Sequence, residues 1–532
     1  MRYINNPRQS RLFDIFEGVL SPLAYKELLA GWQSLFRQTI LGLMPVDTVK
    51  KHFDPALGQP TKELYSMCGL IFLMEFMNWT AEEAARAYMF HVDIQYALNL
   101  DPENQSMSSR TVERYKRLIV RDDLAGRIME DITSALIEKL DLSIAKQRLD
   151  STHIESNMAQ FGRTRMMGVA IKRFLTQLKR HDRETYDGLS EELRSRYQSS
   201  GHLLFGDVKK DAESRRLLRE QVVRDMYDFI ARFADDEKHN TRSTFTMLVR
   251  VFNEQCEIVE DTIEIRKHPG GDVIQNTSDP DATRDGKKGP GYQVQLAETC
   301  DDENDVQLIT AAIPQTAVEH DSHAVEPVLD ALENSGTMPE SMLADTAYGG
   351  DDNVQACEEK GVELVSPTPG KKPEDAYAVN SDDFVVDETT GEVECCPCGE
   401  QPLDTSRGEA QGRTIVVMGA STCDACEQRD ACPVRRRKNG DYEFCFTDKQ
   451  RRLDARRREE ETDAFRERYR KRSGIEATNS ILKRVTGLGR LSVRGSPGVF
   501  HSILLKVAGW NLLQAARALT MRQDRRAALA LG

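Results

Sequence analysis

A series of short strand-like segments, separated by stretches with helical spacing, most limits what this chain can fold into. Such segments cover residues 292–299, 308–313, 341–346 and 362–365, and an earlier one covers residues 147–154. Apolar residues at helical spacing lie between the second and third segments and between the third and fourth. Strands that alternate with helices in this way form a sheet with helices packed on it. The sequence therefore predicts an α/β core.

Outside these segments, the sequence pattern is mainly helical. A length of 532 residues suggests three or four domains at roughly 150 residues each. Residues 20–140 have helical spacing, with Thr80 and Glu83 placed as a helix-capping pair and Ser108 opening a further basic helix. Short helices that end in a basic one fit either a helix-turn-helix-like DNA-binding unit or a plain bundle. Residues 165–250 return to a charged helical pattern.

Charge and hydropathy restrict the partners of the chain. The net charge is −14, but residues 433–532 hold 24 Lys and Arg against 11 Asp and Glu, a net of +13. A basic C-terminal fifth on an acidic body can bind a polyanion. The longest apolar run, residues 67–74, is far shorter than the ~20 residues of a membrane helix. The first residues do not form a signal peptide, so we expect a cytoplasmic protein without a membrane partner.

Three acidic residues are candidates for metal-dependent chemistry. Asp150 and Asp345 are each expected at the end of a strand, where ligands bind in α/β proteins. Glu476 lies in the basic C-terminal region, and Tyr469, Arg472, Glu476 and Lys483 are spaced to share one helix face. Mg²⁺ prefers carboxylate oxygens, and two such ions support in-line displacement at phosphorus. Taken singly, each acid also fits an ordinary surface charge.

These residues stand in motifs that resemble those of the DDE transposases of bacterial insertion sequences, closest to the eleven-eighty-two group. Residues 149–154, Leu-Asp-Ser-Thr-His-Ile, resemble the first-aspartate motif of that family, and residues 343–349, Leu-Ala-Asp-Thr-Ala-Tyr-Gly, resemble the second. The Tyr-x2-Arg-x3-Glu-x6-Lys run from residue 469 matches the signature around the third acid. The likeness covers most of the chain.

The resemblance implies a fold and an activity. The fold is an RNase H-like α/β catalytic core, a mixed sheet flanked by helices, with an all-α N-terminal domain and a small cysteine-rich insertion. The activity is DNA transposition by strand cleavage and strand transfer on double-stranded DNA, at terminal inverted repeats and target DNA. Mg²⁺ or Mn²⁺ would be held by Asp150, Asp345 and Glu476, and DNA would be contacted by Tyr469, Arg472 and Lys483. Two DNA ends handled together imply a homodimer, associated with the nucleoid.

The implied domain order is as follows. Residues 1–140 form the helical DNA-binding region, and residues 141–370 form the first part of the core with a helical insertion at about 165–250. Residues 371–447 form the cysteine-rich insertion, and the basic helical residues 448–532 complete the core. The intervals between the three acids, 195 and 131 residues, are long, which we attribute to these two insertions. The overall acidity is also unusual for a DNA-binding enzyme.

Seven of the eleven cysteines lie between residues 395 and 445. Under reducing conditions such a cluster indicates a metal site more than disulfides. The spacing Cys423-x2-Cys426-x5-Cys432, with Cys396 or Cys398 about 25 residues earlier, supplies the four thiolates of a structural Zn²⁺ site. Cys396 is preferred because related transposases resemble it in having Cys-Pro followed by Gly. Zinc would let a segment judged too small and too acidic for its own core fold as a unit.

Three readings remain open at the level of sequence. The chain is a transposase, an inactive domesticated relative that still binds DNA, or an RNase H-like nuclease that cuts without joining. Retention of all three acids favours catalysis. The arginine runs at residues 435–437 and 456–458 are expected to contact DNA.

Overall fold

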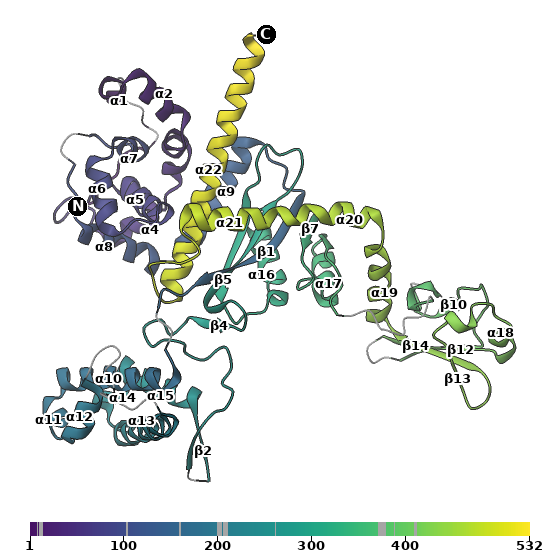
Figure 1. The fold of residues 1–532 in the computed structure, drawn as a ribbon. Coiled ribbons are helices and arrows are strands. Elements are labelled where there is room, and N and C mark those ends of the chain that lie inside the picture. The colour runs from purple at the N-terminus through teal and green to yellow at the C-terminus, as the bar shows by residue number, and fades with distance from the viewer. Residues whose placement is uncertain are drawn as a thin grey trace.

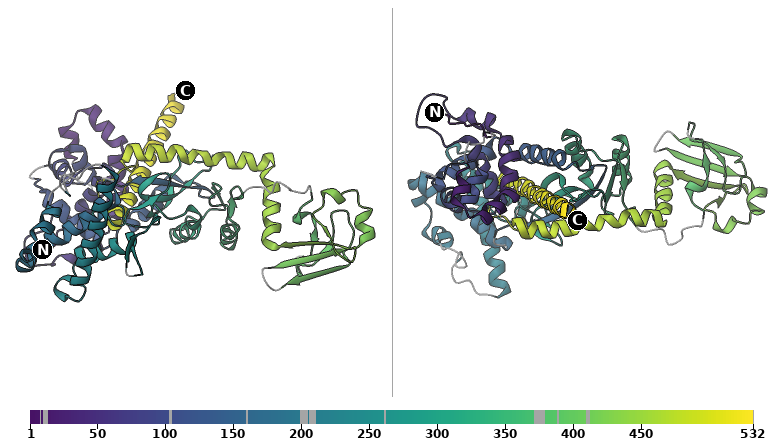
Figure 2. Two further views of the ribbon diagram at one scale, coloured as in Figure 1. Left: turned by 60° about the horizontal axis from the view of Figure 1, so that its bottom comes forward. Right: turned by 90° about the horizontal axis from the view of Figure 1, so that it is seen from above.

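The computed structural model of the chain describes residues 1–7, 9, 14–102, 105–158, 161–198, 205, 211–260, 262–370, 379–387, 389–408 and 412–531. Figure 1 shows a central sheet with the N-terminal helices and a second group of helices on one side of it. On the other side, an arm of helices leads to a small β-rich unit, which stays apart from the rest of the chain in two further views (Figure 2). Residues 371–378, where the cysteine-rich insertion was expected to begin, lie outside the described residues.

The central sheet is mixed. Its order is β4-β5-β1-β7-β8, and β6 also pairs with β5. Strands β1, β7 and β8 run parallel, whereas β5 is antiparallel to β1, β4 and β6. The strands are β1 (Lys146–Glu155), β4 (Thr283–Asp285), β5 (Gly289–Thr299), β6 (Ile309–Thr316), β7 (Ser341–Ala344) and β8 (Glu363–Val365). Each of the five strand-like segments in the sequence is therefore a strand of one sheet, and the mixed order is consistent with an RNase H-like core.

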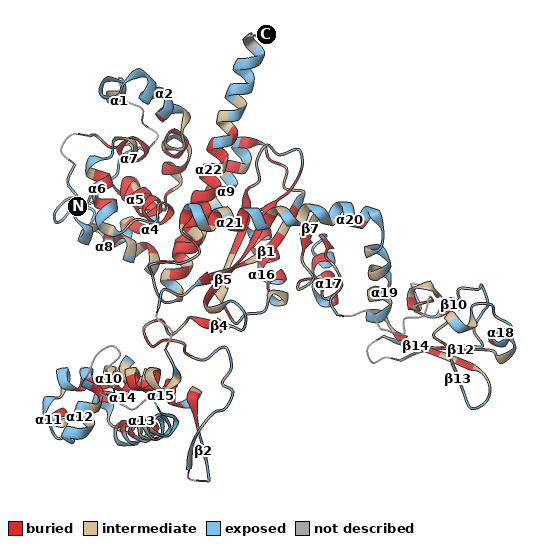
Figure 3. Cartoon of the chain, viewed as in Figure 1, coloured by how far each residue is buried: buried red, intermediate tan, exposed pale blue. Residues whose placement is uncertain are grey.

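Helices cover both faces of this sheet. On one face, α16 (Val325–Asn334) and α17 (Asp351–Glu359) connect β6 to β7 and β7 to β8 and bury their apolar sides with Leu149 and Met342. On the other face lie α9 (Ala125–Leu140) and the first half of α22 (Ser496–Leu531). Figure 3 shows that α22 is buried where it passes the sheet and exposed toward its end. The connecting helices are those that the spacing predicted.

The N-terminal region is helical, as expected. Its central helix, α5, is buried on all sides because α6, α8 and α22 pack around it. Gly509 lets α22 approach α5, since a Cβ atom there would lie 2.3 Å from the Phe76 ring. Thr80 and Glu83 form the predicted capping box at α6, and Ser108 caps α8. The α-helices before α9 are α1 (Ile15–Val19), α2 (Pro22–Ala30), α3 (Trp32–Leu35), α4 (Val46–Val49), α5 (Leu64–Phe76), α6 (Ala81–Phe90), α7 (Val92–Ala97) and α8 (Ser109–Arg121).

A second helical unit is inserted between β1 and β4. It has its own core, in which Phe174 packs edge-on against Phe229 and Phe233. A separate core of this kind allows the unit to fold by itself. Its elements are α10 (Arg163–His181), α11 (Arg183–Asp187), α12 (Glu191–Gln198), α13 (Ala212–Phe233), α14 (Glu237–Asn240), α15 (Ser243–Gln255) and the hairpin β2 (Cys256–Val259) and β3 (Thr262–Ile265).

The cysteine-rich segment forms a small β-rich unit at the end of the arm (Figure 1). A four-stranded sheet of order β11-β12-β14-β13 covers a core in which Phe384 stacks on Phe444. The expectation that this segment is too small for a core was therefore wrong, because alternate residues of β12 and β14 supply one. The elements are β9 (Val385–Val386), β10 (Val393–Cys395), β11 (Asp404–Gly408), β12 (Arg413–Met418), α18 (Ala420–Asp424), β13 (Arg435–Arg436) and β14 (Tyr442–Thr447).

The arm consists of α19 (Asp448–Glu460), α20 (Asp463–Arg470), the 3-10 turn η8 (Lys471–Ser473) and α21 (Gly474–Thr486). Two of its arginines fix it to its neighbours. Arg456 donates hydrogen bonds to the carbonyl oxygens of Gly349 and Ser366 in the core, and Arg458 pairs with Asp382 of the β-rich unit. Both arginines have intramolecular partners, and their contact with DNA stays a prediction.

A buried polar junction joins the N-terminal helices to the arm. The Lys506 ammonium group on α22, 1% exposed, donates to the carbonyl oxygens of Glu75 and Thr486 and to Asn78 Oδ1. The ends of α5 and α21 are thereby held to the same side chain. His501 lies one turn earlier, 4% exposed, and burial lowers its pKa to about 4. None of the helices in the described parts of the chain combines the length and hydropathy of a membrane span.

Because His501 is neutral when folded, we predict that acid destabilises the protein through this residue. An unfolded histidine titrates near 6.5, so stability is full above that pH and falls as the pH drops toward about 4. The loss is on the order of 3 kcal/mol. His501→Phe should flatten the pH dependence of the free energy of unfolding over this window, measured by urea titration. Exposed His268→Phe is the control, and an equal acid response in both variants contradicts the assignment.

Candidate active site

Asp150 lies in the middle of β1, not at its end as expected. The strand continues to Glu155 because β5 goes on pairing with it as far as Gly291. Its other neighbour, β7, pairs only with residues 146–149 and ends at Ala344, opposite Leu149. The carboxyl end of β7 therefore lies level with Asp150, and the two predicted aspartates fall side by side at this edge.

Asp345 follows β7 directly and opens a tight turn. Its carboxylate accepts a hydrogen bond from the Ala347 backbone N–H at 2.8 Å, and its carbonyl oxygen accepts one from the Ser366 hydroxyl. Gly349 completes the turn against the next strand, since a Cβ atom there would lie 2.1 Å from the Pro367 carbonyl oxygen. The small residues in this motif are thus required by the close packing of the turn.

Glu476 is placed by the arm. It lies in the first turn of α21, directly after the 3-10 turn η8, which carries Arg472. Tyr469 belongs to α20, before the turn, and its ring stacks on Phe465. The 3-10 turn η8 lies between α20 and α21, but Arg472 and Glu476 still share one face, since they pair as residues i and i+4. The order of the motif along the arm is kept.

The three carboxylates converge on one guanidinium group. Arg472 Nη2 lies 3.1 Å from Asp150 Oδ1 and 3.7 Å from Asp345 Oδ2, and Nη1 lies 2.9 Å from Glu476 Oε1. Arg472 and Asp150 are largely buried, whereas the Glu476 side chain is 62% exposed. The structure thus brings together all three predicted acids around a single positive charge.

The electrostatics of the site follow from burial and crowding. Burial raises the pKa of Asp150; Arg472 opposes this shift and Asp345 adds to it. Burial alone would lower the pKa of Arg472, but Asp150 and its neighbours raise it, so the guanidinium stays charged. Carboxylates this close together cannot all be ionised at low cost unless a cation lies nearby. Such groups are common in functional sites.

Two further interactions position the acids, and the sequence motifs did not reveal them. Asn479, one turn after Glu476, donates a hydrogen bond to Asp150 Oδ2 at 3.0 Å. Glu298 on β5, 1% exposed, accepts hydrogen bonds from Arg148 and from the Thr478 hydroxyl. Burial raises the pKa of Glu298, and the Arg148 charge opposes this. The sequence could have indicated the role of Asn479, because this residue lies on the Glu476 side of the helix. No sequence pattern indicated the role of Glu298.

Lys483 lies on α21, two turns after Glu476, and is half-buried. It makes no direct contact with the three acids. Burial and the neighbouring Lys288 lower its pKa. Burial also lowers the pKa of His153 on β1, with Lys288 and Lys483 adding to the shift. Lys288 and Lys483 therefore place positive charge beside the carboxylates, whereas the lowered pKa of His153 keeps its ring neutral.

The three carboxylates are suitable ligands for a divalent metal ion, although their present arrangement is not that of a metal site. Nowhere in the described ranges do three or more His, Cys, Asp or Glu side chains form a group that can hold a metal ion. Carboxylate oxygens are nevertheless the ligands that Mg²⁺ prefers. Their convergence on Arg472 shows that all three can face one cation at the same time.

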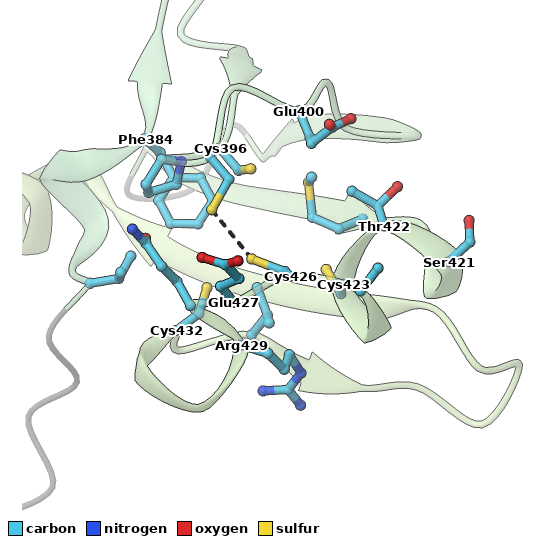
Figure 4. A pocket seen from close by; sticks show the side chains of 17 residues that line it. Phe384, Cys396, Glu400, Ser421, Thr422, Cys423, Cys426, Glu427, Arg429 and Cys432 are labelled. Atoms are coloured by element: carbon cyan, nitrogen blue, oxygen red, sulfur yellow. Dashed lines mark hydrogen bonds between the residues drawn. The ribbon is translucent and has the colours of Figure 1, made fainter.

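Five cysteines line a cavity of about 530 Å³ in the β-rich unit (Figure 4). Cys398 Sγ lies 3.3 Å from Cys426 Sγ. Residues 396–399 form a tight turn, since the Gly399 N–H bonds to the Cys396 carbonyl oxygen and Gly399 has a φ of 82°. Burial raises the pKa of the Cys423 thiol to about 11, with neighbouring cysteines adding to the shift. The lining cysteines are Cys396, Cys398, Cys423, Cys426 and Cys432, whereas Cys395 and Cys445 do not line the cavity.

The buried pair Arg148–Glu298 is predicted to hold α21 against the sheet. Glu298→Ala leaves Arg148 without its carboxylate and should lower the free energy of unfolding by about 3–5 kcal/mol. The double variant Arg148→Met/Glu298→Leu should lower it clearly less, because no unpaired charge remains. Urea unfolding of the wild type and the two variants measures this. A double variant as unstable as Glu298→Ala contradicts the charge-pairing argument.

Part of the chain is similar to a known protein family. The family model described as Transposase DDE domain matches residues 262–512, which include Asp345 and Glu476 but not Asp150. No curated protein matches the chain. Among solved structures, a piggyBac transposase synaptic complex with hairpin DNA, determined by cryo-electron microscopy, is similar over 96% of this chain and 81% of that chain, at 8% identity. Its TM-score of 0.26 is too low to support an inference. Just under half of the chain is thus similar to a transposase DDE domain.

Proposed function

We propose that this chain is a transposase that cleaves DNA at the ends of an insertion sequence and joins the ends to target DNA. The convergence of Asp150, Asp345 and Glu476 on a single cation carries the proposal. The match of residues 262–512 to the Transposase DDE domain family supports it, because DNA transposition is a reaction that such carboxylates can serve.

In this proposal, Asp150, Asp345 and Glu476 hold Mg²⁺ or Mn²⁺. Such ions activate a water molecule or a 3′-hydroxyl group and stabilise the leaving oxygen of an in-line displacement. Asn479 keeps the Asp150 carboxylate turned toward the site through its hydrogen bond. The Arg148–Glu298–Thr478 contacts keep α21, and with it Glu476, at a fixed distance from the sheet.

DNA contacts are assigned to the cations of the same motif. Arg472 bonds to all three carboxylates, so it can contact a phosphate only when another cation takes over those charges. Lys483, together with Lys288, presents positive charge beside the acids. Tyr469 lies half-buried next to Arg472, where it can position the backbone.

Binding of the terminal repeats is assigned to residues 1–140. Helix α8 turns Val112, Tyr115 and Ile119 into the core and leaves its arginines exposed. A helix with an exposed basic face is suited to DNA. The other assigned parts are the core at residues 141–370 with its helical insertion, the cysteine-rich insertion at 371–447 and the completing helices at 448–532. A homodimer that holds two DNA ends is part of the same proposal.

A structural Zn²⁺ is assigned to the cysteine-lined cavity. Cys423, Cys426 and Cys432 come from one segment and Cys396 from the facing turn, with Cys398 as the alternative fourth ligand. Burial and repulsion from neighbouring thiolates raise the pKa of Cys423, and both costs are offset when a metal ion binds the thiolates.

We predict that the wild-type protein cleaves a plasmid carrying the DNA that flanks its gene, at defined ends and only with Mg²⁺ or Mn²⁺. Glu476→Gln should lower the cleavage rate at least 100-fold, because one metal-binding carboxylate is lost. Glu467→Gln is the matched control, since Glu467 is exposed on α20 and pairs only with Arg470. Equal loss in both variants, or full activity of Glu476→Gln, contradicts the proposal. Cleavage without strand joining favours a nuclease.

We predict one Zn²⁺ per chain in purified protein. Cys423→Ser and Cys426→Ser should each lower the zinc content, measured by atomic mass spectrometry, to less than half of the wild-type value. Cys445→Ser, which changes a cysteine outside the cavity, should leave it unchanged. Zinc-free wild-type protein, or equal zinc loss in all three variants, argues against the site.

A further inference from the structure

A second group of polar side chains lies on the face of the sheet that α16 covers. Ser151 lies two residues after Leu149 on β1, so both side chains point to this face, whereas the Asp150 carboxylate points to the other. The Ser151 hydroxyl donates a hydrogen bond to Asp321 Oδ2 at 3.1 Å. Asp321 begins the 3-10 turn η5 (Asp321–His323), which leads into α16. One carboxylate thus holds β1 beside Asp150 from behind the sheet.

Gln295 connects Asp321 to the turn that carries Asp345. It lies on β5 directly opposite Ser151 and is fully buried. Its Nε2 donates a hydrogen bond to Asp321 Oδ1 at 2.9 Å, and its Oε1 accepts one from the Tyr348 hydroxyl at 2.5 Å. Tyr348 is also fully buried and lies three residues after Asp345. A continuous chain of hydrogen bonds therefore joins β1, beside the first aspartate, to the turn that holds the second.

The hydrogen bonds of this chain can run in one direction only. A carboxylate accepts hydrogen bonds, so Asp321 requires a donor from each of its two neighbours. This requirement turns the Gln295 amide so that Nε2 faces Asp321 and Oε1 faces Tyr348. Burial raises the pKa of Tyr348 far above its usual value, so its hydroxyl stays protonated and can donate. The second Nε2 hydrogen of Gln295 bonds to Gln315 Oε1 at 3.1 Å, which satisfies the buried amide.

The Tyr348 end of the chain holds the turn that directs the Asp345 carboxylate. The Tyr348 backbone N–H bonds to the Asp345 carbonyl oxygen, and the Ala347 N–H bonds to Asp345 Oδ1. Asn353 on α17 donates a hydrogen bond to the Tyr348 carbonyl oxygen. Because β7 ends just before this turn, a rotation of the turn would move the Asp345 carboxylate relative to Asp150.

The contacts on the two faces of the sheet fix different parts of the site. On the α21 side, Arg472 and Asn479 bond to the carboxylates themselves. On the α16 side, Asp321, Gln295 and Tyr348 bond to residues beside the two aspartates. These bonds can therefore persist when a metal ion replaces Arg472 between the carboxylates.

We propose that Asp321, acting through Gln295, is a positioning residue that sets the separation of the Asp150 and Asp345 carboxylates for metal binding. This inference rests on the proposed function, because it concerns the metal site of that function. Contacts that orient metal ligands from outside typically contribute about 10–100-fold to metal affinity.

Isothermal titration calorimetry of the full chain with Mn²⁺ tests the inference. Asp150→Asn identifies the part of the Mn²⁺ binding that belongs to the carboxylates. We expect Asp321→Ala to raise the dissociation constant for Mn²⁺ at this site about 10-fold. Asp330→Ala is the matched control, because Asp330 is exposed on α16 and pairs with Lys360. It should change the constant less than about twofold, since an exposed charge is screened.

Tyr348→Phe separates position from charge. It removes one oxygen atom and no charge, and it should also raise the Mn²⁺ dissociation constant about 10-fold. The double variant Asp321→Ala/Tyr348→Phe should bind Mn²⁺ little more weakly than Asp321→Ala, because both substitutions act through Gln295. A network that only stabilises the fold would lower the free energy of unfolding in urea and leave the dissociation constant unchanged.

An unchanged dissociation constant in folded Asp321→Ala and Tyr348→Phe overturns the inference, and Tyr348→Phe alone decides if Asp321→Ala does not fold. Effects that multiply in the double variant also overturn it. If the variants bind Mn²⁺ and cleave the DNA ends as the wild type does, the proposed function stands without the positioning network. If the wild type has no Mn²⁺ binding that Asp150→Asn removes, both proposals fail.

Discussion

The guanidinium group of Arg472 is the interaction on which the catalytic region depends. It faces carboxylates from β1, from the turn after β7 and from α21, three elements that are far apart in sequence. Asp150 is largely buried, so its charge is costly without a nearby cation. The parallel register of β1 and β7 fixes two of the acids, and the η8 turn that carries Arg472 brings in the third. A cation at this point therefore stabilises the packing of the three elements against one another.

The surroundings of the site hold α21 at both ends. Near its start, Thr478 and Asn479 bond to carboxylates of the sheet. At its end, the Thr486 carbonyl oxygen accepts a hydrogen bond from Lys506, which also bonds to the last turn of α5. A displacement of the N-terminal helices would therefore reach the helix that carries Glu476 through these hydrogen bonds. The site and the N-terminal region share one buried network.

Much of the core was predictable because its signals are local. The strand segments and the motifs around Asp150 and Asp345 are continuous in sequence, and their pairing follows from the alternation of strands and helices. The strand-like segment at residues 147–154 already extended beyond Asp150, but the residue at which β1 ends depends on how far β5 pairs with it. The role of Glu298 depends likewise on a strand register that no spacing encodes. The small core around Phe384 is a tertiary effect that composition does not reveal.

The central claim is that the three carboxylates form one site for a divalent cation, in which Arg472 holds the place of the metal charge. Anomalous diffraction from crystals soaked in Mn²⁺ tests it most directly. The account predicts an anomalous peak at about 2.0–2.3 Å from the Asp150 and Asp345 carboxylates, with the Arg472 guanidinium moved away from both. No peak at this place, with Arg472 still between the acids at saturating Mn²⁺, would contradict it.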